Sequence, residues 1–290
     1  TYGKKLEENL SNLLMRIRRG TYRPEPSRIV EIPKEDGSTR PLAIACFEDK
    51  IVQLAVSTIL SAIYEPIFLK CSFGFRPNLS CHDAIKTLSQ TMFKVQDGAV
   101  VEIDLRKYFN SIPHGPMLDM LHKKISDLRF VRLISVLLQA PTLSPSGKSE
   151  MNKIGSPQGS IVSPVLANVF LHHAIDEWFT SINQSHFGDQ AWEIRYADDM
   201  VFVFNRMSDA VRFHRSLGKR LNKYGIEINE EKSSLIPAGK RAALRASNQG
   251  KRIPTFKFLG FVCYWGRSRS NKKLWCPKLK SRGEIGRAHV

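Results

Sequence analysis

Two adjacent acids, Asp198 and Asp199, lie in a stretch that is otherwise apolar and strand-like. A third acid, Asp104, lies in another β-like run, residues 100–105. Buried carboxylates must be paired, protonated or bound to metal, and hairpin turns prefer Asn-Gly or Asp-Gly to Asp-Asp. Three carboxylates on two strands suit a pair of divalent ions that clamp the attacking and leaving oxygens of a phosphoryl transfer. The alternative is an Asp-Asp turn beside an unrelated strand acid, and the residues around these acids decide between the two.

The charge of the chain indicates the class of its partner. The 290 residues include 44 Lys or Arg and 27 Asp or Glu, which gives a formal net charge of +17. From Lys232 to the end there are 15 Lys or Arg and a single acid, Glu284. Nucleic acid binds such a surface through phosphate neutralisation and counterion release.

The sequence shows no feature of a secreted or membrane protein. No signal peptide and no apolar run long enough to cross a bilayer is seen, so no membrane partner is expected. The five cysteines lack zinc-ligand spacing, which indicates reduced thiols. His172 and His173 point different ways on an α-helix and are interpreted as structural. We expect a protein of the bacterial cytoplasm.

Helical and strand patterns alternate irregularly along the chain. There is no regular βαβα order, so hairpins interleaved with helices predict an α+β fold in which helices back an antiparallel sheet. The hairpin with Asp36-Gly37 at its turn has the strongest local signal. The expected helices are 4–18, 49–64, 80–90, 160–180 and 208–225, with a helical region at 116–139 and strand-like pieces at 226–228 and 256–265.

Seven motifs in a fixed order carry a resemblance to a known family. They are Ile32-Pro33-Lys34 with Arg40-Pro41-Leu42, Phe73-Gly74-Phe75-Arg76-Pro77, Asp104 with Tyr108-Phe109, Gly155-Ser156-Pro157-Gln158-Gly159, Ser163-Pro164-Val165-Leu166-Ala167-Asn168, Tyr196-Ala197-Asp198-Asp199 and Phe258-Leu259-Gly260-Phe261. With these motifs the chain resembles a reverse transcriptase of the group II intron type, over residues 6 to 282.

The resemblance implies the fingers and palm of a right-hand polymerase. Fingers are expected over 1–98, with the N-terminal helix, the hairpin 29–44 and the helices 49–64 and 80–90. The palm is expected over 99–265, with a helical insertion on the fingers side at 116–153. Residues 266–290 would begin a linker to a missing or truncated thumb. Residues 283–290 do not look like family sequence and are expected to be a non-native tail.

The resemblance also implies the catalytic metal site. Asp104, Asp198 and Asp199 would be catalytic and would bind two Mg²⁺ ions, which Mn²⁺ could replace, together with the backbone carbonyl of Leu105. Hard oxygen ligands suit Mg²⁺, which keeps waters and takes substrate phosphates as its other ligands. One ion would lower the pKa of the primer 3′-hydroxyl, and the other would stabilise the leaving pyrophosphate.

Several positions would contact the incoming deoxynucleoside triphosphate. Lys34 and Arg40 match fingers residues that grip the triphosphate, with Arg suited to bidentate phosphate contact. Phe109 matches a steric gate that collides with a 2′-hydroxyl and so selects deoxynucleotides. The other positions that the resemblance assigns to nucleotide binding are Gln158, Gly159 and Lys232.

Template and primer contacts complete the expected site. Arg76 would contact the RNA template, and Phe258, Leu259 and Gly260 would hold the end of a DNA or RNA primer.

The first interpretation is an RNA-directed DNA polymerase. The alternatives are an RNA-binding maturase that acts on its own intron RNA, and a host-adopted relative such as a CRISPR-associated, retron or phage-defence reverse transcriptase. Three carboxylates are costly to bury, and a binding module does not need them, so they favour the polymerase.

Overall fold

The computed structural model describes residues 2–33, 37, 39–144, 148–157, 159–272 and 274–281, with the side chain of Arg40 left out. The chain divides into two compact units. Unit 1 comprises Thr1–Ile67 and Lys107–Phe170, and unit 2 comprises Phe68–Arg106 and Leu171–Val290. The predicted fingers and palm boundaries stay a prediction. The expected non-native tail lies outside the described residues.

Unit 1 contains helices and one mixed four-stranded sheet. In this sheet the strand order is β2-β1-β4-β5, and β1 and β2 form the predicted antiparallel hairpin. Ser27 of β1 pairs in parallel with Thr142 of β4. The strands are β1 (Ser27–Pro33), β2 (Thr39–Ile44), β4 (Thr142–Leu143) and β5 (Ser149–Glu150). The helices are η1 (Tyr2–Lys5), α1 (Leu6–Arg18), α2 (Phe47–Tyr64), α4 (Tyr108–Ser111), α5 (His114–His122), α6 (Leu128–Leu138) and α7 (Ser163–Leu171), whose last residue belongs to unit 2.

Unit 2 is built on a four-stranded sheet with the order β6-β7-β3-β8. All three strand pairs are antiparallel, as predicted for a palm-like sheet. A second sheet has the order β11-β10-β9. The strands are β3 (Gly98–Ile103), β6 (Ala191–Tyr196), β7 (Asp199–Phe204), β8 (Ser234–Ala238), β9 (Phe256–Phe258), β10 (Phe261–Arg267) and β11 (Trp275–Ser281). The helices are α3 (Cys81–Lys94), the π-turns η2 (His172–Asp176) and η3 (Asn183–Phe187), α8 (Glu177–Ile182), α9 (Met207–Asn222) and α10 (Lys240–Asn248).

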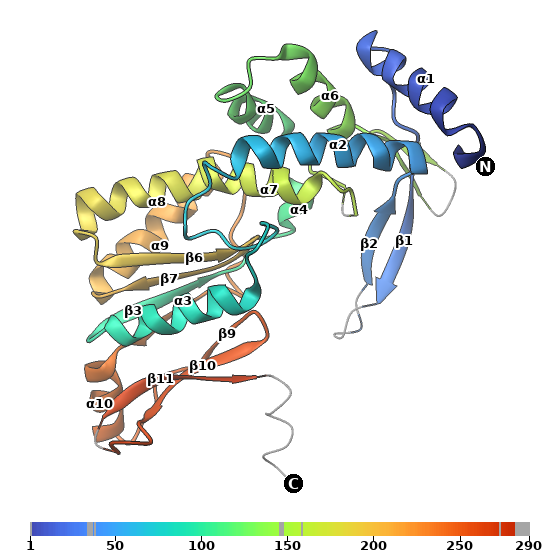
Figure 1. The fold of residues 1–290 in the computed structure, drawn as a ribbon. Helices are drawn as coiled ribbons and strands as arrows, with labels where there is room; N and C mark the ends of the chain where they lie inside the picture. The colour runs from blue at the N-terminus through green and yellow to red at the C-terminus, as the bar shows by residue number, and fades with distance from the viewer. Residues whose placement is uncertain are drawn as a thin grey trace. The chain divides into compact units, whose positions relative to one another are not determined.

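Both faces of the main sheet in unit 2 are covered, which explains the unbroken apolar run in β7. Side chains alternate between the faces of a strand. Val201 and Val203 therefore join the hydrophobic cluster that contains α3 and the second sheet. Phe202 and Phe204 point to the other face and pack on Phe213 of α9, with ring centroids 4.5 and 5.2 Å away. Figure 1 shows α3 on one side of the sheet and α8 and α9 on the other.

Three local expectations need correction. The expected helix 160–180 begins at Ser163, and the π-turn η2 lies within it between α7 and α8. The expected strand 226–228 forms only an isolated bridge at Ile228. The strand β8 was not expected, since its Pro237 removes a ladder donor, which an edge strand tolerates. No helix within the described residues is long and apolar enough to span a membrane.

Candidate active site

Strand register brings the three predicted catalytic acids of unit 2 to one end of its main sheet. In the antiparallel pair of β3 and β7, Ile103 lies opposite Met200. The next residue on each side of this pair is an acid, Asp104 on one strand and Asp199 on the other. Asp198 precedes Asp199 in the two-residue turn between β6 and β7. The sequence-predicted cluster is therefore formed at this edge of the sheet.

The electrostatics of the cluster suit a divalent cation. Desolvation and the negative charges of Asp198, Asp104 and Glu102 raise the pKa of Asp199 to about 6, although this residue is exposed at the surface. Like charges at close range disfavour ionisation, and a cation bound between them would remove that penalty. The donors are all oxygens, which hard divalent cations prefer. In charge and in donor type, the residues present therefore suit a divalent cation.

Asp104 is held by two residues that sequence reasoning missed, Asn229 and Ser233. The side-chain amide of Asn229 donates to Asp104 Oδ1 over 3.0 Å, and Ser233 Oγ accepts from the Asp104 N–H over 3.1 Å. Lys232, which is predicted to contact the nucleotide, lies between Asn229 and Ser233 and is exposed. Its N–H donates to the Asn229 carbonyl over 3.1 Å. Leu105 is buried and forms an antiparallel bridge with Ile228. Asn229 lies 125 residues from Asp104, so no local pattern could reveal this contact.

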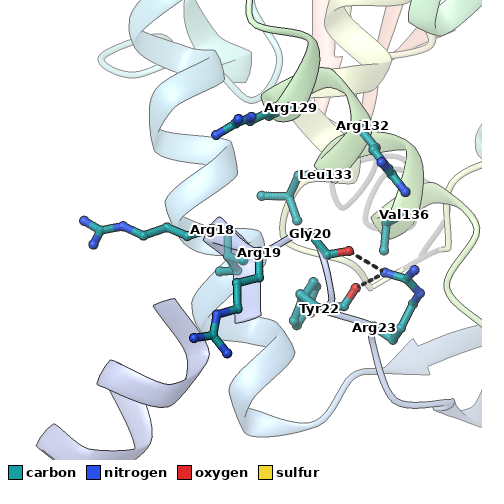
Figure 2. Close-up of a pocket in the computed structure, with 10 residues that line it drawn as sticks. Arg18, Arg19, Gly20, Tyr22, Arg23, Arg129, Arg132, Leu133 and Val136 are labelled. Carbon is teal, nitrogen blue, oxygen red and sulfur yellow. Dashed lines mark hydrogen bonds between the residues drawn. The ribbon is translucent and has the colours of Figure 1, made fainter. Parts of the chain in front are cut away.

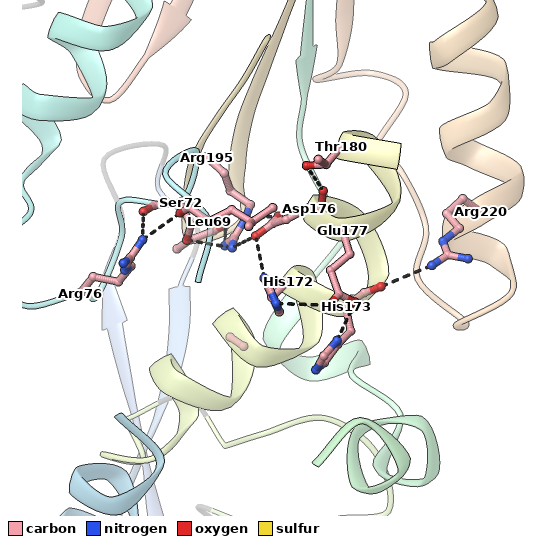
Figure 3. A network of polar contacts seen from close by, with 12 residues as sticks. Leu69, Ser72, Arg76, His172, His173, Asp176, Glu177, Thr180, Arg195 and Arg220 are labelled. Atoms are coloured by element: carbon pink, nitrogen blue, oxygen red, sulfur yellow. Dashed lines mark hydrogen bonds and ion pairs between the residues drawn. The ribbon is translucent and has the colours of Figure 1, made fainter. Parts of the chain in front are cut away.

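A buried arginine fixes the turn that carries Asp198. Ala197 has a φ of +56°, a left-handed conformation that is unusual for a residue other than glycine. Its carbonyl accepts from Arg195 Nη1 over 3.1 Å. The same guanidinium binds Asp176 through both carboxylate oxygens, over 2.8 and 2.6 Å, and donates to Ser72 Oγ over 2.8 Å (Figure 3). Burial alone would raise the pKa of Asp176, but the charge and hydrogen bonds of Arg195, together with His172, outweigh burial and lower this pKa.

The predicted Phe-Gly-Phe-Arg-Pro loop packs against this turn. Its Phe73 N–H donates to the Arg195 carbonyl over 2.8 Å. Gly74 lies so close to the turn that a Cβ would stand 2.4 Å from the Ala197 nitrogen. The guanidinium of Arg76 donates to the carbonyls of Leu69 and Ser72, over 2.9 and 2.7 Å, and so fastens its own loop. A template contact by Arg76 stays a prediction.

The predicted primer-grip residues form a tight hairpin turn in unit 2. Phe258 pairs with Phe261 across the strands β9 and β10, so Leu259 and Gly260 are the two turn residues. Both have positive φ values, +49° and +80°. Two-residue hairpin turns of the I′ type require positive φ at both positions, which Gly260 adopts easily and Leu259 does not. Such strain at a non-glycine residue is typical of functional sites.

In unit 1, the steric-gate candidate and the Gly-Ser-Pro-Gln-Gly turn lie together. The Ser156 N–H donates to the carbonyl of half-buried Phe109 over 2.7 Å. Gly159 has a φ of +100°, and a Cβ there would stand 2.7 Å from the Ala43 carbonyl oxygen on β2. On the same strand, Arg40 pairs with Ile32 of β1. Of the other predicted nucleotide contacts, Lys34 and Gln158 and the side chain of Arg40 lie outside the described residues.

Comparison with known proteins agrees with this geometry. Residues 32–263 match the family described as reverse transcriptase (RNA-dependent DNA polymerase). The chain belongs to this family. It is 39% identical over 169 residues to the group II intron-encoded protein LtrA of Lactococcus lactis subsp. cremoris, a match that covers 57% of this chain and 27% of LtrA. It is 30% identical over 308 residues to protein YkfC of Escherichia coli strain K12, covering 92% of this chain and 79% of YkfC.

Solved structures show the same fold at low sequence identity. A telomerase from Candida tropicalis, truncated from its C-terminal domain, superposes with a TM-score of 0.63 at 15% identity, over 88% of this chain and 55% of that chain. The predicted α+β reverse transcriptase fold and the resemblance to the group II intron type are both confirmed. The chain spans 21% of a 91 kDa cob-intron protein of Schizosaccharomyces pombe and 27% of LtrA.

Proposed function

We propose that this chain is an RNA-directed DNA polymerase that adds deoxynucleotides to a primer 3′-hydroxyl on an RNA template. The observation that carries the proposal is the meeting of Asp104, Asp198 and Asp199 at one edge of an antiparallel sheet, in a chain of the reverse transcriptase family. A protein that only held RNA would gain nothing from three adjacent carboxylates, because they repel a phosphate backbone.

Each residue of the site has its own role in the proposed reaction. When bound, two Mg²⁺ ions, or Mn²⁺ in their place, would supply Lewis-acid activation of the primer hydroxyl and charge stabilisation of the leaving pyrophosphate. Asp104, Asp198 and Asp199 would hold these ions, with the Leu105 carbonyl as a further ligand. Asn229 fixes the orientation of the Asp104 carboxylate through its 3.0 Å hydrogen bond. Arg195 fixes the turn of Asp198.

The nucleotide would be selected by residues of unit 1. Phe109 would place its ring under the sugar and exclude a 2′-hydroxyl. Lys34 and Arg40 would neutralise the triphosphate, and Gln158 would hydrogen-bond the sugar or the template edge. The close packing of Gly159 against β2 supports a compact nucleotide pocket in this unit, because no side chain fits between the two backbones.

A cavity rich in arginine in unit 1 supports a polyanionic partner. It has a volume of about 200 Å³ and lies beside the end of α1 and the helix α6 (Figure 2). Among the described residues, none of its arginines forms an ion pair with a carboxylate. An unneutralised guanidinium cluster suits the phosphates of template, primer or intron RNA. The arginines that line it are Arg18, Arg19, Arg23, Arg129 and Arg132.

Primer extension on an RNA template tests the proposal. Wild-type protein is expected to extend a DNA primer with Mg²⁺ and deoxynucleotides, and Asp198→Asn is expected to lose at least about a thousandfold in rate. Asp119→Asn is the matched control, because Asp119 is an exposed acid on α5. Near-native extension by Asp198→Asn would refute the catalytic assignment. RNA binding without extension by the wild type would favour the maturase alternative.

A further inference from the structure

A second set of metal-ligand side chains is gathered in unit 2 by the π-turn η2. The N–H of Glu177 donates to the carbonyl of His172, five residues back along the chain. In an α-helix, residues five apart point about 140° away from each other. The i→i+5 bond of a π-turn instead brings them onto neighbouring positions. The expectation that His172 and His173 point different ways assumed α-helical geometry, but their ring centroids lie 5.0 Å apart. The interpretation of both as structural stays a prediction.

The three side chains meet at short distances. His173 Nδ1 lies 2.8 Å from Glu177 Oε2, and His172 Nε2 lies 3.5 Å from Glu177 Oε1. One potential ligand atom from each of the three lies within 4.8 Å of the other two. Figure 3 shows both imidazole rings turned toward the glutamate at the start of α8. Two imidazoles and a carboxylate form a known type of zinc ligand set.

His172 supplies an independent reason to expect a ligand here. Its side chain is 1% exposed, and within the described residues neither ring nitrogen has a hydrogen-bond partner. The nearest carboxylate oxygens lie 3.5 Å from Nε2, on Glu177, and 3.8 Å from Nδ1, on Asp176, both beyond hydrogen-bond length. Buried polar groups are almost always satisfied, so this ring calls for an explanation.

The 3.5 Å between His172 Nε2 and Glu177 Oε1 is close to the distance between two ligand atoms on one ion. Two ligands that each lie about 2.0–2.1 Å from a tetrahedral zinc ion stand about 3.4 Å apart. The 2.8 Å contact between His173 Nδ1 and Glu177 Oε2 would lengthen by about 0.6 Å to reach the same spacing. Glu177 is the residue that would move, because its side chain is 48% exposed whereas both imidazoles are buried.

We propose that His172, His173 and Glu177 form a binding site for a divalent cation of the zinc type, with water as the fourth ligand. Nitrogen donors favour zinc over Mg²⁺ and Ca²⁺, which take oxygen ligands. Nδ1 of His172 faces Asp176, the arrangement in which a carboxylate orients a metal-binding imidazole. The exposed Glu177 gives the ion a route from solvent.

Zinc at this site would tie the π-turn to α8. The turn is already contacted by α9, whose Arg220 donates to the carbonyls of Ala174 and His173 over 2.9 and 3.3 Å. A ligand that binds only the folded state raises the unfolding temperature. Zinc is therefore expected to raise the melting temperature of the whole chain, independently of any polymerase activity.

Zinc affinity of the full chain tests the proposal. Metal-free protein is titrated with Zn²⁺ against a chromophoric chelator in excess Mg²⁺, and with Co²⁺ as a spectroscopic probe. Glu177→Gln and His173→Ala are compared with Glu7→Gln, a matched exposed helical glutamate. All proteins carry His82→Ala, because His82 Nδ1 lies 3.6 Å from Cys81 Sγ and could bind zinc itself.

The expected result is one tightly bound Zn²⁺ in the parent and in Glu7→Gln, with the visible Co²⁺ absorption of a four- or five-coordinate site. Glu177→Gln and His173→Ala should lose at least about tenfold in zinc affinity. Unchanged affinity in both variants, or no zinc bound by the parent, overturns the proposal. Asp198→Asn should keep zinc binding while losing primer extension, so failure of this site and failure of the polymerase assignment are separate outcomes.

Discussion

Replacing Gly74 by alanine tests how the turn of Asp198 is positioned. A Cβ at Gly74 would stand 2.4 Å from the Ala197 nitrogen and 2.9 Å from the Tyr196 carbonyl carbon. Ordinary contacts of a Cβ begin at 3.4 Å, so the loop and the turn must separate by about 1 Å. Both opposing atoms belong to the backbone, so no side-chain rotation can relieve the overlap.

The expected effect on catalysis exceeds the effect on folding. A displacement of about 1 Å in a catalytic constellation can cost about a hundredfold in rate. Overpacking of this kind destabilises a protein by about 1–3 kcal/mol, which leaves a domain of ordinary stability folded. Gly74→Ala should therefore be a folded protein that extends primers about a hundredfold more slowly than wild type.

Single-turnover primer extension with saturating template-primer, well below the melting temperature, measures this effect. Gly115→Ala is the matched control, because Gly115 lies in α5 and a Cβ there meets nothing within 4 Å. The control should keep its rate, and its stability should change by less than about 1 kcal/mol, because Gly115 precedes Pro116 and gains little from a Cβ in the helix. If Gly74→Ala extended primers as fast as Gly115→Ala, the loop would not position the turn and this reasoning would fail.

Three further predictions address other parts of the molecule. Asn229→Ala should raise the Mg²⁺ concentration for half-maximal extension about 10–100-fold, since Asp104 loses its orienting partner, and an unchanged Mg²⁺ titration would contradict that role. Burial and the charge of Asp176 raise the pKa of Glu193 well above 4.5, so the folded state holds a proton that the unfolded state releases. Stability in denaturant titrations should then fall as pH rises from 4.5 toward the folded pKa, and Glu193→Gln should flatten this dependence; a wild-type curve that rises over that range would rule the explanation out. Neutralising both Arg129 and Arg132 with glutamine should lower the slope of log affinity against log salt for single-stranded RNA by about 1.4, equally for all sequences, and a sequence-dependent loss would argue against phosphate contacts.

The strands that carry the catalytic acids could be predicted because their signals are local. The apolar runs around Asp104 and Asp199 have the composition of buried strands, and such runs pair within a sheet. The order of the motifs then indicated the reverse transcriptase fold. The hairpin of β1 and β2 could also be predicted, because Asp-Gly is a strong turn signal and the flanking residues alternate.

The residues that position these acids could not be predicted, because their contacts are distant in sequence. Asn229 meets Asp104 across 125 residues, and Ser72 meets Arg195 across 123. The π-turn was hidden for a different reason. Its residues are buried, so the hydrophobic pattern shows no phase shift where the extra residue enters the helix. The hydrophobic pattern therefore did not indicate that His172 lies beside Glu177.

One buried network joins the catalytic turn to the proposed zinc site. A left-handed alanine costs about 1–3 kcal/mol and persists only where its surroundings fix it. The carbonyl of Ala197 is fixed by Arg195, Arg195 is fixed by the two oxygens of Asp176, and Asp176 lies in the π-turn beside His172. A buried ion pair that loses one partner leaves an uncompensated charge, so the whole chain of contacts must form together. An ion that anchors His172 would therefore favour the same arrangement of Asp176 that holds the turn of Asp198 in place.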